Sequence, residues 1–272
     1  MKVKVIPVLE DNYMYLVIEE LTREAVAVDV AVPKRLLEIV GREGVSLTAV
    51  LTTHHHWDHA RGNPELARLR PGLAVLGADE RIFSLTRRLA HGEELRFGAI
   101  HVRCLLTPGH TSGHMSYFLW EDDCPDPPAL FSGDALLVAG CGSCLEGSAQ
   151  QMYQSLAELG SLPPETKVFC GHEHTLSNLE FAQKVEPSND HVRAKLSWAK
   201  ARVGEDGLRG ALRQAPIMTR ACGHFRRGTR TMCPQCPRLW ARSASTTPSC
   251  GWREYGRCMW TLRKASGGLV EG

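Results

Sequence analysis

The strongest signal in this chain is Thr53-His54-His55-His56-Trp57-Asp58-His59. It follows the apolar run Leu47–Thr53, which predicts a buried strand. His54 and His56 are two residues apart, so an extended backbone points both imidazoles to the same side, and Asp58 and His59 follow where a helix is expected to begin. Imidazole and carboxylate together suit zinc or iron, and two ions can share such a cluster. A purification tag would be terminal and would lack the aspartate at this spacing.

Three further motifs place ligand-type residues directly after predicted strands. They are Thr107-Pro108-Gly109-His110-Thr111, Ser132-Gly133-Asp134 and Cys170-Gly171-His172-Glu173-His174. Glycine lets the chain turn sharply there, so the next side chain can enter a site at the strand edge. Each motif alone is more simply structural, but with the first stretch they form one candidate set: His54, His56, Asp58, His59, His110, Asp134 and His172. Seven ligands are too many for one zinc ion but fit two ions, and Asp134 is the candidate residue to bridge them.

The first 200 residues alternate between short β-prone runs and helical spacings. Strands are expected at Val3–Val8, Tyr13–Ile18, Ala25–Val30, Leu47–Thr53, Leu73–Leu76, His101–Leu106, Met115–Trp120, Leu130–Phe131 and Lys167–Cys170. Helices are expected at Pro33–Gly41, Asn63–Arg70, Ser148–Leu159, Leu176–Val185 and His191–Val203. This order predicts an α/β (α+β) fold with a sheet-rich core covered by helices.

The composition is that of an ordinary globular protein. The chain has 272 residues, 43% hydrophobic and 23% charged, which argues against extensive disorder and leaves room for one large domain or two modest ones. No apolar run approaches the ~18 residues of a membrane helix. The N-terminus lacks the apolar core of a secretory signal, and it is too acidic for a transit peptide. Ten cysteines form no regular disulfide framework, so we expect reduced thiols in a cytoplasmic protein.

Residues 205–272 differ in composition from the rest of the chain. They carry twelve Lys and Arg against four Asp and Glu, with no sustained period of a helix or a strand, and a disordered tail is expected. A structural zinc site at Cys222, His224, Cys233 and Cys236, with Cys250 and Cys258 beyond, is a weaker interpretation, as is nucleic-acid binding by the arginines. The abrupt change favours a shifted reading frame, that is, an alternative C-terminus.

These motifs together resemble the metallo-β-lactamase superfamily, and within it glyoxalase II, hydroxyacylglutathione hydrolase. The resemblance rests on THHHWDH, LLTPGHTSGH, LFSGDAL, AGCG…EG and CGHEHTLSNLEFA, and it extends from residue 1 to about 203. It implies an αββα sandwich over residues 1–173 and the start of a helical glutathione-binding domain over residues 174–204, with 205–272 as a divergent tail. It also implies one metal held by His54, His56 and His110 and a second held by Asp58, His59 and His172, with Asp134 between them.

The resemblance implies hydrolysis of thioesters by two divalent metal ions, with Asp58 and Asp134 as catalytic residues. The expected metal is zinc, with iron as the alternative at one site. The expected reaction converts S-(2-hydroxyacyl)glutathione into glutathione and a 2-hydroxy acid. The partner is then a small molecule rather than a nucleic acid or a membrane, and the chain is expected to be a monomer.

The expected substrate-binding residues are Ser143, Cys144, Leu145, His172, Glu173 and His174. Three departures from the glyoxalase II pattern bear on function. Ser143-Cys144-Leu145 stands where the family usually carries a basic residue and then aromatics, so a contact to a glutathione carboxylate is missing. His174 replaces a tyrosine and can still donate a hydrogen bond. Arg61 stands in place of a glycine near the metals; it would either repel cations or point to solvent, and we expect it to point to solvent.

Two other functions stay open. The first is a metal-binding relative with weak or no catalytic activity. The second is oxidation of glutathione persulfide at a single iron, against which the complete second ligand set argues.

Overall fold

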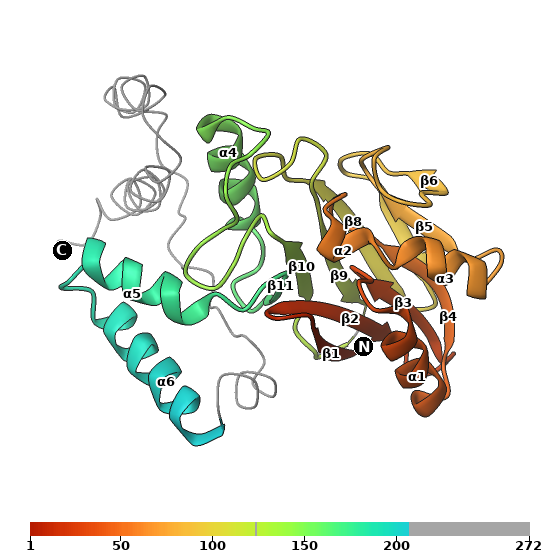
Figure 1. Ribbon diagram of the computed structural model, residues 1–272, viewed down its shortest axis with the longest axis horizontal. Helices are drawn as coiled ribbons and strands as arrows, with labels where there is room; N and C mark the ends of the chain where they lie inside the picture. The colour runs from red at the N-terminus through yellow and green to blue at the C-terminus, as the bar shows by residue number, and fades with distance from the viewer. Residues whose placement is uncertain (123, 207–272) are drawn as a thin grey trace.

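Two β-sheets face each other across a shared core, and helices cover their outer faces (Figure 1). The computed structural model describes residues 1–122 and 124–206. This arrangement confirms the predicted αββα sandwich. The predicted disordered tail, and the weaker interpretations of a structural zinc site and of nucleic-acid binding, concern residues that lie outside the described part of the chain, apart from Glu205 and Asp206.

The first sheet has the strand order β1-β2-β3-β4-β5-β6. Its strands are β1 (Lys2–Val8), β2 (Asn12–Ile18), β3 (Glu24–Val28), β4 (Ser46–Leu51), β5 (Ala74–Gly77) and β6 (Arg87–Arg88). The first three form an antiparallel meander, whereas β3 to β6 run parallel. The parallel connections carry α1 (Pro33–Glu43), α2 (Trp57–Ala60) and α3 (Asn63–Leu69). Buried residues of α1 and α3, such as Leu36 and Leu66, pack on the outer face of this sheet.

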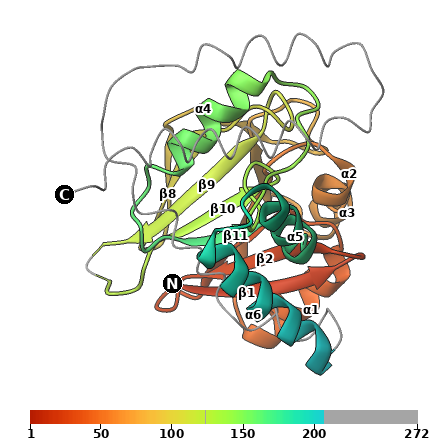
Figure 2. The same cartoon turned by 90° about the vertical axis from the view of Figure 1, so that its left-hand side faces the viewer.

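The second sheet has the order β11-β10-β9-β8-β7. Its strands are β7 (Glu94–Phe97), β8 (Ile100–Leu106), β9 (Met115–Glu121), β10 (Ala129–Gly133) and β11 (Lys167–Cys170). Strands β7 to β10 are antiparallel neighbours, and β11 is parallel to β10. The connection to β11 contains α4 (Ala149–Leu159), which lies along the outer face of the sheet and packs Leu159 against Leu105 and Leu130 (Figure 2).

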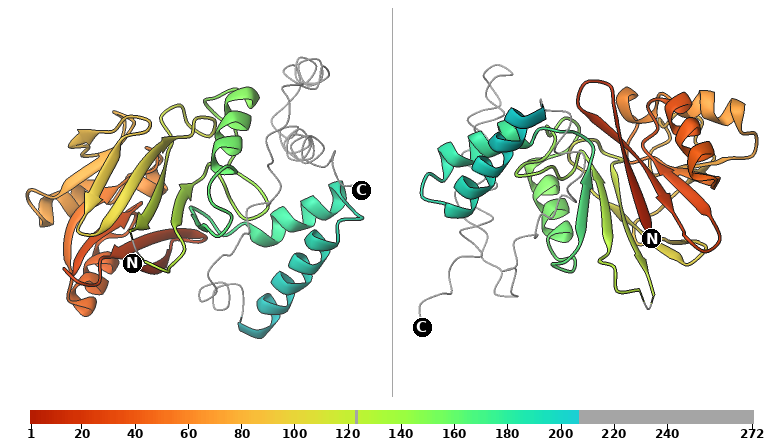
Figure 3. Two further views of the ribbon diagram at one scale, coloured as in Figure 1. Left: turned by 180° about the vertical axis from the view of Figure 1, so that it is seen from behind. Right: turned by 90° about the horizontal axis from the view of Figure 1, so that it is seen from below.

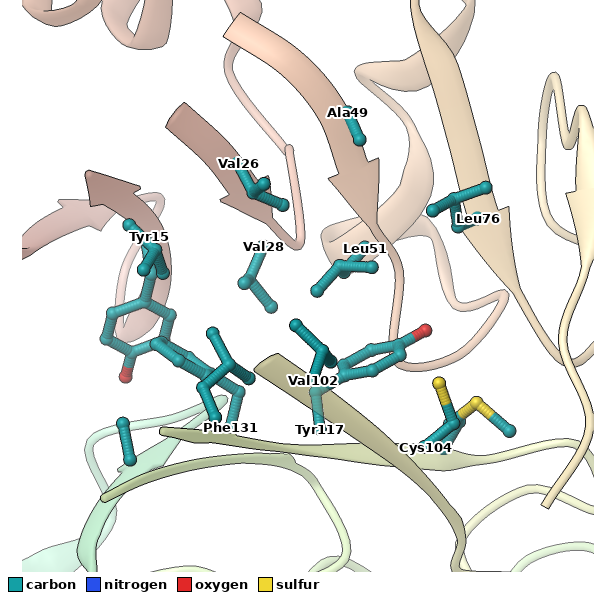
Figure 4. Close-up of a cluster of buried hydrophobic side chains, with 14 of the residues drawn as sticks. Tyr15, Val26, Val28, Ala49, Leu51, Leu76, Val102, Cys104, Tyr117 and Phe131 are labelled. Atoms are coloured by element: carbon teal, nitrogen blue, oxygen red, sulfur yellow. The ribbon is translucent and has the colours of Figure 1, made fainter. Parts of the chain in front are cut away.

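The main core lies between the two sheets. Figure 4 shows Tyr15, Val28 and Leu51 of the first sheet meeting Tyr117 and Phe131 of the second. All seven residues of β2 are buried, because alternate side chains face the second sheet and the helices of the first. Both faces of this strand are therefore covered, and after Asn12 its sequence has no polar stripe.

A helical hairpin follows the sandwich. It consists of α5 (Thr175–Val185) and α6 (Asp190–Asp206), joined through Leu179, Leu196 and Ala199. The Asn178 side-chain amide donates a hydrogen bond to the Val138 carbonyl (3.0 Å) and ties α5 to the segment after β10. The hairpin lies to one side of the two sheets (Figure 3). Among the described residues, no helix combines the length and the apolar character needed to cross a bilayer.

Candidate metal centre

The seven predicted ligands come from strand ends that meet at one edge of the sandwich. His54 lies beyond β4, His110 beyond β8, Asp134 directly after β10 and His172 beyond β11. Strands β8 and β10 are both antiparallel to β9, and β10 is parallel to β11, so their carboxyl ends share an edge. Every predicted ligand belongs to one of three groups of converging donor atoms: His54, His56 and His110; Asp58, His59 and His172; and His54, His59 and Asp134.

The first group consists of three histidines. His56 Nδ1 lies 3.1 Å from His54 Nε2 and 3.0 Å from His110 Nε2. Burial lowers the pKa of His54 well below its ordinary value, and it also lowers the pKa of His56. Both imidazoles are therefore neutral, and their lone pairs are available to a metal.

The second group combines a carboxylate with two histidines. His59 Nε2 and His172 Nε2 are 3.2 Å apart, and Asp58 Oδ2 lies 3.3 Å from His172 Nε2. Burial opposes it, but hydrogen bonds to Asp134 and Asp58 raise the pKa of His172 to about 11. The nearby carboxylates therefore favour a positive charge at this point, which a divalent cation would supply.

Asp134 connects the two groups. Its Oδ2 lies 3.2 Å from His172 Nε2 and 3.4 Å from His110 Nε2, and its Oδ1 lies 3.5 Å from His59 Nε2. Asp134 Oδ1 is buried without a hydrogen-bond partner among the described residues. A buried carboxylate oxygen without a partner is costly unless a cation satisfies it. The donor set therefore fits two divalent ions, with Asp134 placed to contact both.

Two glycines allow the strand ends to approach this closely. Gly133 has a φ of +46°, and a Cβ on it would lie 2.6 Å from Thr53 Oγ1. A Cβ on Gly171 would lie 2.2 Å from Asp134 Oδ1. The glycines before Asp134 and His172 are thus required by the packing of the site, as the sequence pattern indicates.

Asp29 is a supporting residue that sequence analysis missed. It follows β3, and its Oδ2 accepts hydrogen bonds from His59 Nδ1 (2.9 Å) and Thr53 Oγ1 (2.8 Å), while its Oδ1 accepts one from Thr53 N (2.8 Å). The carboxylate fixes the His59 ring with Nε2 toward the metal groups. The available signal was a carboxylate inside the otherwise apolar run Ala25–Val30.

The turn between β1 and β2 supplies a second missed support. Asp11 Oδ1 lies 3.1 Å from His172 Nδ1, and its Oδ2 lies 2.8 Å from His174 Nε2. The Asn12 amide donates to Asp58 Oδ2 (2.9 Å). In the sequence these residues indicate only a break between two strands.

His114 also supports the site. Its Nε2 accepts a hydrogen bond from the Asp134 backbone (3.2 Å), and its Nδ1 lies 2.9 Å from Thr107 Oγ1. Burial lowers the pKa of His114 to about 3. It is therefore a neutral group that positions Asp134.

The predicted substrate residues lie around the ligands, but most already have intramolecular partners. The Ser143 carbonyl accepts a hydrogen bond from His110 Nδ1 (2.8 Å), and Cys144 Sγ donates to the Gly147 carbonyl (3.1 Å). Glu173 accepts a hydrogen bond from the Tyr13 hydroxyl (2.6 Å). Leu145 is 62% exposed.

Two of the residues that depart from the family pattern, His174 and Arg61, make structural contacts. The His174 ring stacks on the His172 ring at 5.2 Å while its Nε2 faces Asp11. The Arg61 guanidinium lies over the Trp57 ring at 3.9 Å, and its Nε donates to the Ala31 carbonyl (2.9 Å). Arg61 is thus half-buried on an aromatic ring rather than free in solvent.

Comparison with known families assigns the chain to a class. Residues 17–172 match the family described as the metallo-beta-lactamase superfamily, and residues 173–208 match the hydroxyacylglutathione hydrolase C-terminus. The chain belongs to the metallo-beta-lactamase superfamily.

Its relatives place it in the glyoxalase II-like branch. The chain is 86% identical to the human hydroxyacylglutathione hydrolase-like protein over 290 aligned residues that cover all of both chains. It is 84% identical to the mouse hydroxyacylglutathione hydrolase-like protein over 207 residues, or 76% of this chain and 73% of the mouse protein.

Solved structures share the fold. ETHE1 from Myxococcus xanthus is 31% identical with a TM-score of 0.58, covering 82% of this chain and 100% of that one. A metallo-beta-lactamase from Staphylococcus aureus is 24% identical with a TM-score of 0.56, covering 64% of this chain and 56% of that one. TTHA1623 in a di-iron-bound form is 26% identical with a TM-score of 0.50, covering 64% and 92%. With the His and Asp groups above, these likenesses indicate divalent metal ions.

Proposed function

We propose that this protein is a binuclear metal-dependent thioester hydrolase that converts S-(2-hydroxyacyl)glutathione into glutathione and a 2-hydroxy acid. The observation that carries the proposal is the pair of ligand groups joined by Asp134. His54, His56 and His110 would hold one ion, and Asp58, His59 and His172 the other. Residues 1–173 then form the catalytic unit, and residues 174–204 begin the part that binds glutathione.

The side chains prepare the site for attack on a carbonyl. Bound divalent cations lower the pKa of water and polarise a carbonyl oxygen. Asp58 belongs to the second ligand group and accepts a hydrogen bond from the Asn12 amide at 2.9 Å, and it could also orient the attacking oxygen by accepting a hydrogen bond from it. Asp29, Asp11 and the Ser143 carbonyl hold the rings of His59, His172 and His110, so the ligands need little reorganisation during the reaction.

The leaving group suits a site without a dedicated proton donor. A thiol of pKa about 8.5 leaves as a thiolate, whereas an amine or an alkoxide needs protonation. His55, the histidine between two ligands, directs its ring nitrogens to Asp79 and Glu146. This arrangement favours a thioester over an amide.

Zinc is the metal we propose, since neutral imidazoles and carboxylates are its usual ligands, with iron as the alternative at one site. None of the five cysteines in the described part is in a disulfide, which supports a cytoplasmic location. We also propose a monomer.

The test is hydrolysis of S-lactoylglutathione by protein of measured metal content, beside Asp134→Ala. Metal-dependent turnover that is lost in the variant supports the proposal. Two metals per chain without turnover of any thioester would instead favour the non-catalytic relative. One iron per chain would favour persulfide oxidation.

A further inference from the structure

Arg81 joins three loops that lie beside the first ligand group. Its guanidinium donates to both oxygens of Asp79 (Nε–Oδ1 3.0 Å, Nη2–Oδ2 2.7 Å) and to both oxygens of Glu146 (Nη1–Oε1 2.6 Å, Nη2–Oε2 2.7 Å). Nη2 also donates to Ser112 Oγ (3.1 Å). Asp79 belongs to the loop after β5, Ser112 to the loop after β8 and Glu146 to the loop before α4. Two paired carboxylates occupy the planar fork of the guanidinium, an arrangement that a lysine ammonium cannot reproduce.

Two of these loops are also in direct backbone contact. Glu146 Oε2 accepts hydrogen bonds from Ser112 N (2.9 Å) and Ser112 Oγ (3.0 Å). The Gly147 N–H donates to the Gly109 carbonyl (3.1 Å), and a Cβ on Gly147 would lie 2.6 Å from Gly109 Cα. The loop before α4 thus packs on the loop after β8 with no room for a methyl group between them.

The ligand His110 is oriented across this contact. It belongs to the loop after β8, and its Nδ1 lies 2.8 Å from the Ser143 carbonyl in the loop before α4. A carbonyl can only accept, so Nδ1 carries the proton and Nε2 keeps its lone pair. Nε2 lies 3.0 Å from His56 Nδ1 and 3.4 Å from Asp134 Oδ2, within the first ligand group. The relative position of the two loops therefore decides where His110 Nε2 points.

The charges of the three loops make Arg81 the central member of this contact. Asp79 Oδ2 and Glu146 Oε2 both lie 2.7 Å from the same Arg81 nitrogen. The Asp79 side chain is only 8% exposed, so it is costly to leave without a cation. Removing the guanidinium leaves two carboxylates that repel each other across the contact. Glu146→Gln is milder, because its amide oxygen can still accept from the Ser112 N–H.

We infer that Arg81 is a positioning residue for the metal ion of the first ligand group. By holding the three loops together, it keeps the Ser143 carbonyl against His110 Nδ1 and so directs His110 Nε2 at the ion. The inference rests on the metal binding that the proposed function requires, but not on hydrolysis. A surface ion pair without this connection would add little to stability and would not affect one ion more than the other.

Competition with a chromophoric chelator measures the affinity of the full chain for each of its zinc ions. Arg81→Met should weaken one ion about tenfold or more and leave the other near the parent value, as losing a partner outside the ligand shell does. Arg81→Lys should fall between, because an ammonium can pair with one carboxylate but cannot bridge both. Arg88→Met is the matched control, because Arg88 also pairs with a glutamate (Glu80, 2.8 Å) but otherwise donates to the Ala78 carbonyl.

The second readout is the Nδ1 proton of His110, which ¹⁵N–¹H NMR of the imidazoles detects when a hydrogen bond protects it from exchange with water. His110→Gln identifies the resonance by its absence. We expect the resonance in the parent protein and in Arg88→Met, and its loss in Arg81→Met. The measurement needs neither metal nor turnover, so it also tests the inference on metal-free protein.

Three results would overturn the inference: affinities in Arg81→Met equal to those in Arg88→Met, an unchanged His110 resonance in Arg81→Met, or equal weakening of both ions together with a lower urea midpoint. If Arg81→Met does not fold, Arg81→Lys decides by the same readouts. A parent protein with two metals but no turnover refutes the proposed function alone. Turnover in the parent protein, with Arg81 variants that match Arg88→Met in both readouts, refutes the inference alone.

Discussion

Asp134 connects the two candidate ligand groups, because its carboxylate oxygens lie within 3.5 Å of nitrogens from both. Its Oδ1 is buried without a hydrogen-bond partner among the described residues, and a bound cation would satisfy this oxygen. Removing this carboxylate therefore affects both ions.

Asp134→Ala is expected to reduce bound metal from two ions per chain to one or fewer, which elemental analysis after dialysis measures. Asp122→Ala is the matched control, because Asp122 is an exposed aspartate of the same sheet region, paired with His101. Two tightly bound metals in Asp134→Ala would show that the bridging role is wrong.

Asp29→Asn tests whether the Asp29 carboxylate positions the candidate ligand His59. The amide keeps the shape of the side chain but loses the charge that holds the Nδ1 proton of His59. Losing such an outer partner typically costs 10- to 100-fold in metal affinity. Competition with a chromophoric chelator should show this loss at one of the two ions, and unchanged affinity at both would contradict the role.

At the scale of elements, ion pairs join neighbouring loops, and a capping box holds the start of α4. Glu146 accepts hydrogen bonds from Arg81 and from the Ser112 backbone (2.9 Å), and hydrogen bonding to Arg81 is the main reason that its pKa lies well below the usual range. The Arg81–Glu146 pair is partly exposed, so it contributes little to global stability. Breaking it should instead loosen the loop that contains Leu145, one of the expected substrate-binding residues.

Glu146→Gln should therefore raise KM for a thioester several-fold while the unfolding midpoint and the metal content stay near those of the parent protein. Steady-state kinetics together with a denaturation curve separate these effects. Glu94→Gln, which weakens the exposed pair with Arg103, serves as the control. An equal rise in KM in both variants would contradict a specific role of Glu146.

Ser148 caps α4 through a capping box, in which its side chain accepts from Gln151 N and Gln151 reaches back to the Ser148 backbone. Ser148→Ala should lower the free energy of unfolding by about 1 kcal/mol. A urea titration measures this change, and metal content should stay constant because no ligand lies in α4. A loss below a few tenths of a kcal/mol would mean that the cap contributes little.

The sequence predicted the elements with a strong apolar signal to within a few residues. Strand β2 and helix α1 are examples, the first because both of its faces are covered and the second because Pro33 starts it and Gly44 ends it in a left-handed conformation. Strands β6 and β7 were missed. They are short and exposed, with charged residues in half or more of their positions, so they lack an apolar pattern.

The same contrast applies to the site. The ligands His54 to His59 stand together in the chain, so their spacing alone indicates metal chemistry. Asp29 and Asp11 support ligands that lie 30 and 161 residues away. Such partners depend on how the sheets pack, and no local pattern in the sequence reveals them.

At the scale of the whole molecule, the candidate ligands come from both sheets. His54 follows the first sheet, whereas His110, Asp134 and His172 follow strands of the second. An ion bound between them therefore stabilises the folded sandwich, and the unfolded chain has no such site.

Removing metal with a chelator should lower the thermal unfolding midpoint substantially. For one site at a thousandfold excess of free metal over Kd, the stabilisation is about 4 kcal/mol. Calorimetry of metal-loaded and stripped protein measures the shift, and Asp134→Ala should show a smaller one. Identical midpoints would show that the site does not bind metal in the folded protein.

The most direct test of the proposed function is the turnover of S-lactoylglutathione by protein of known metal content. We predict two divalent metals per chain, with turnover that disappears on chelation, returns on reloading and is absent in Asp134→Ala. A preparation with two metals per chain that hydrolyses neither S-lactoylglutathione nor any other acyl thioester would contradict the account.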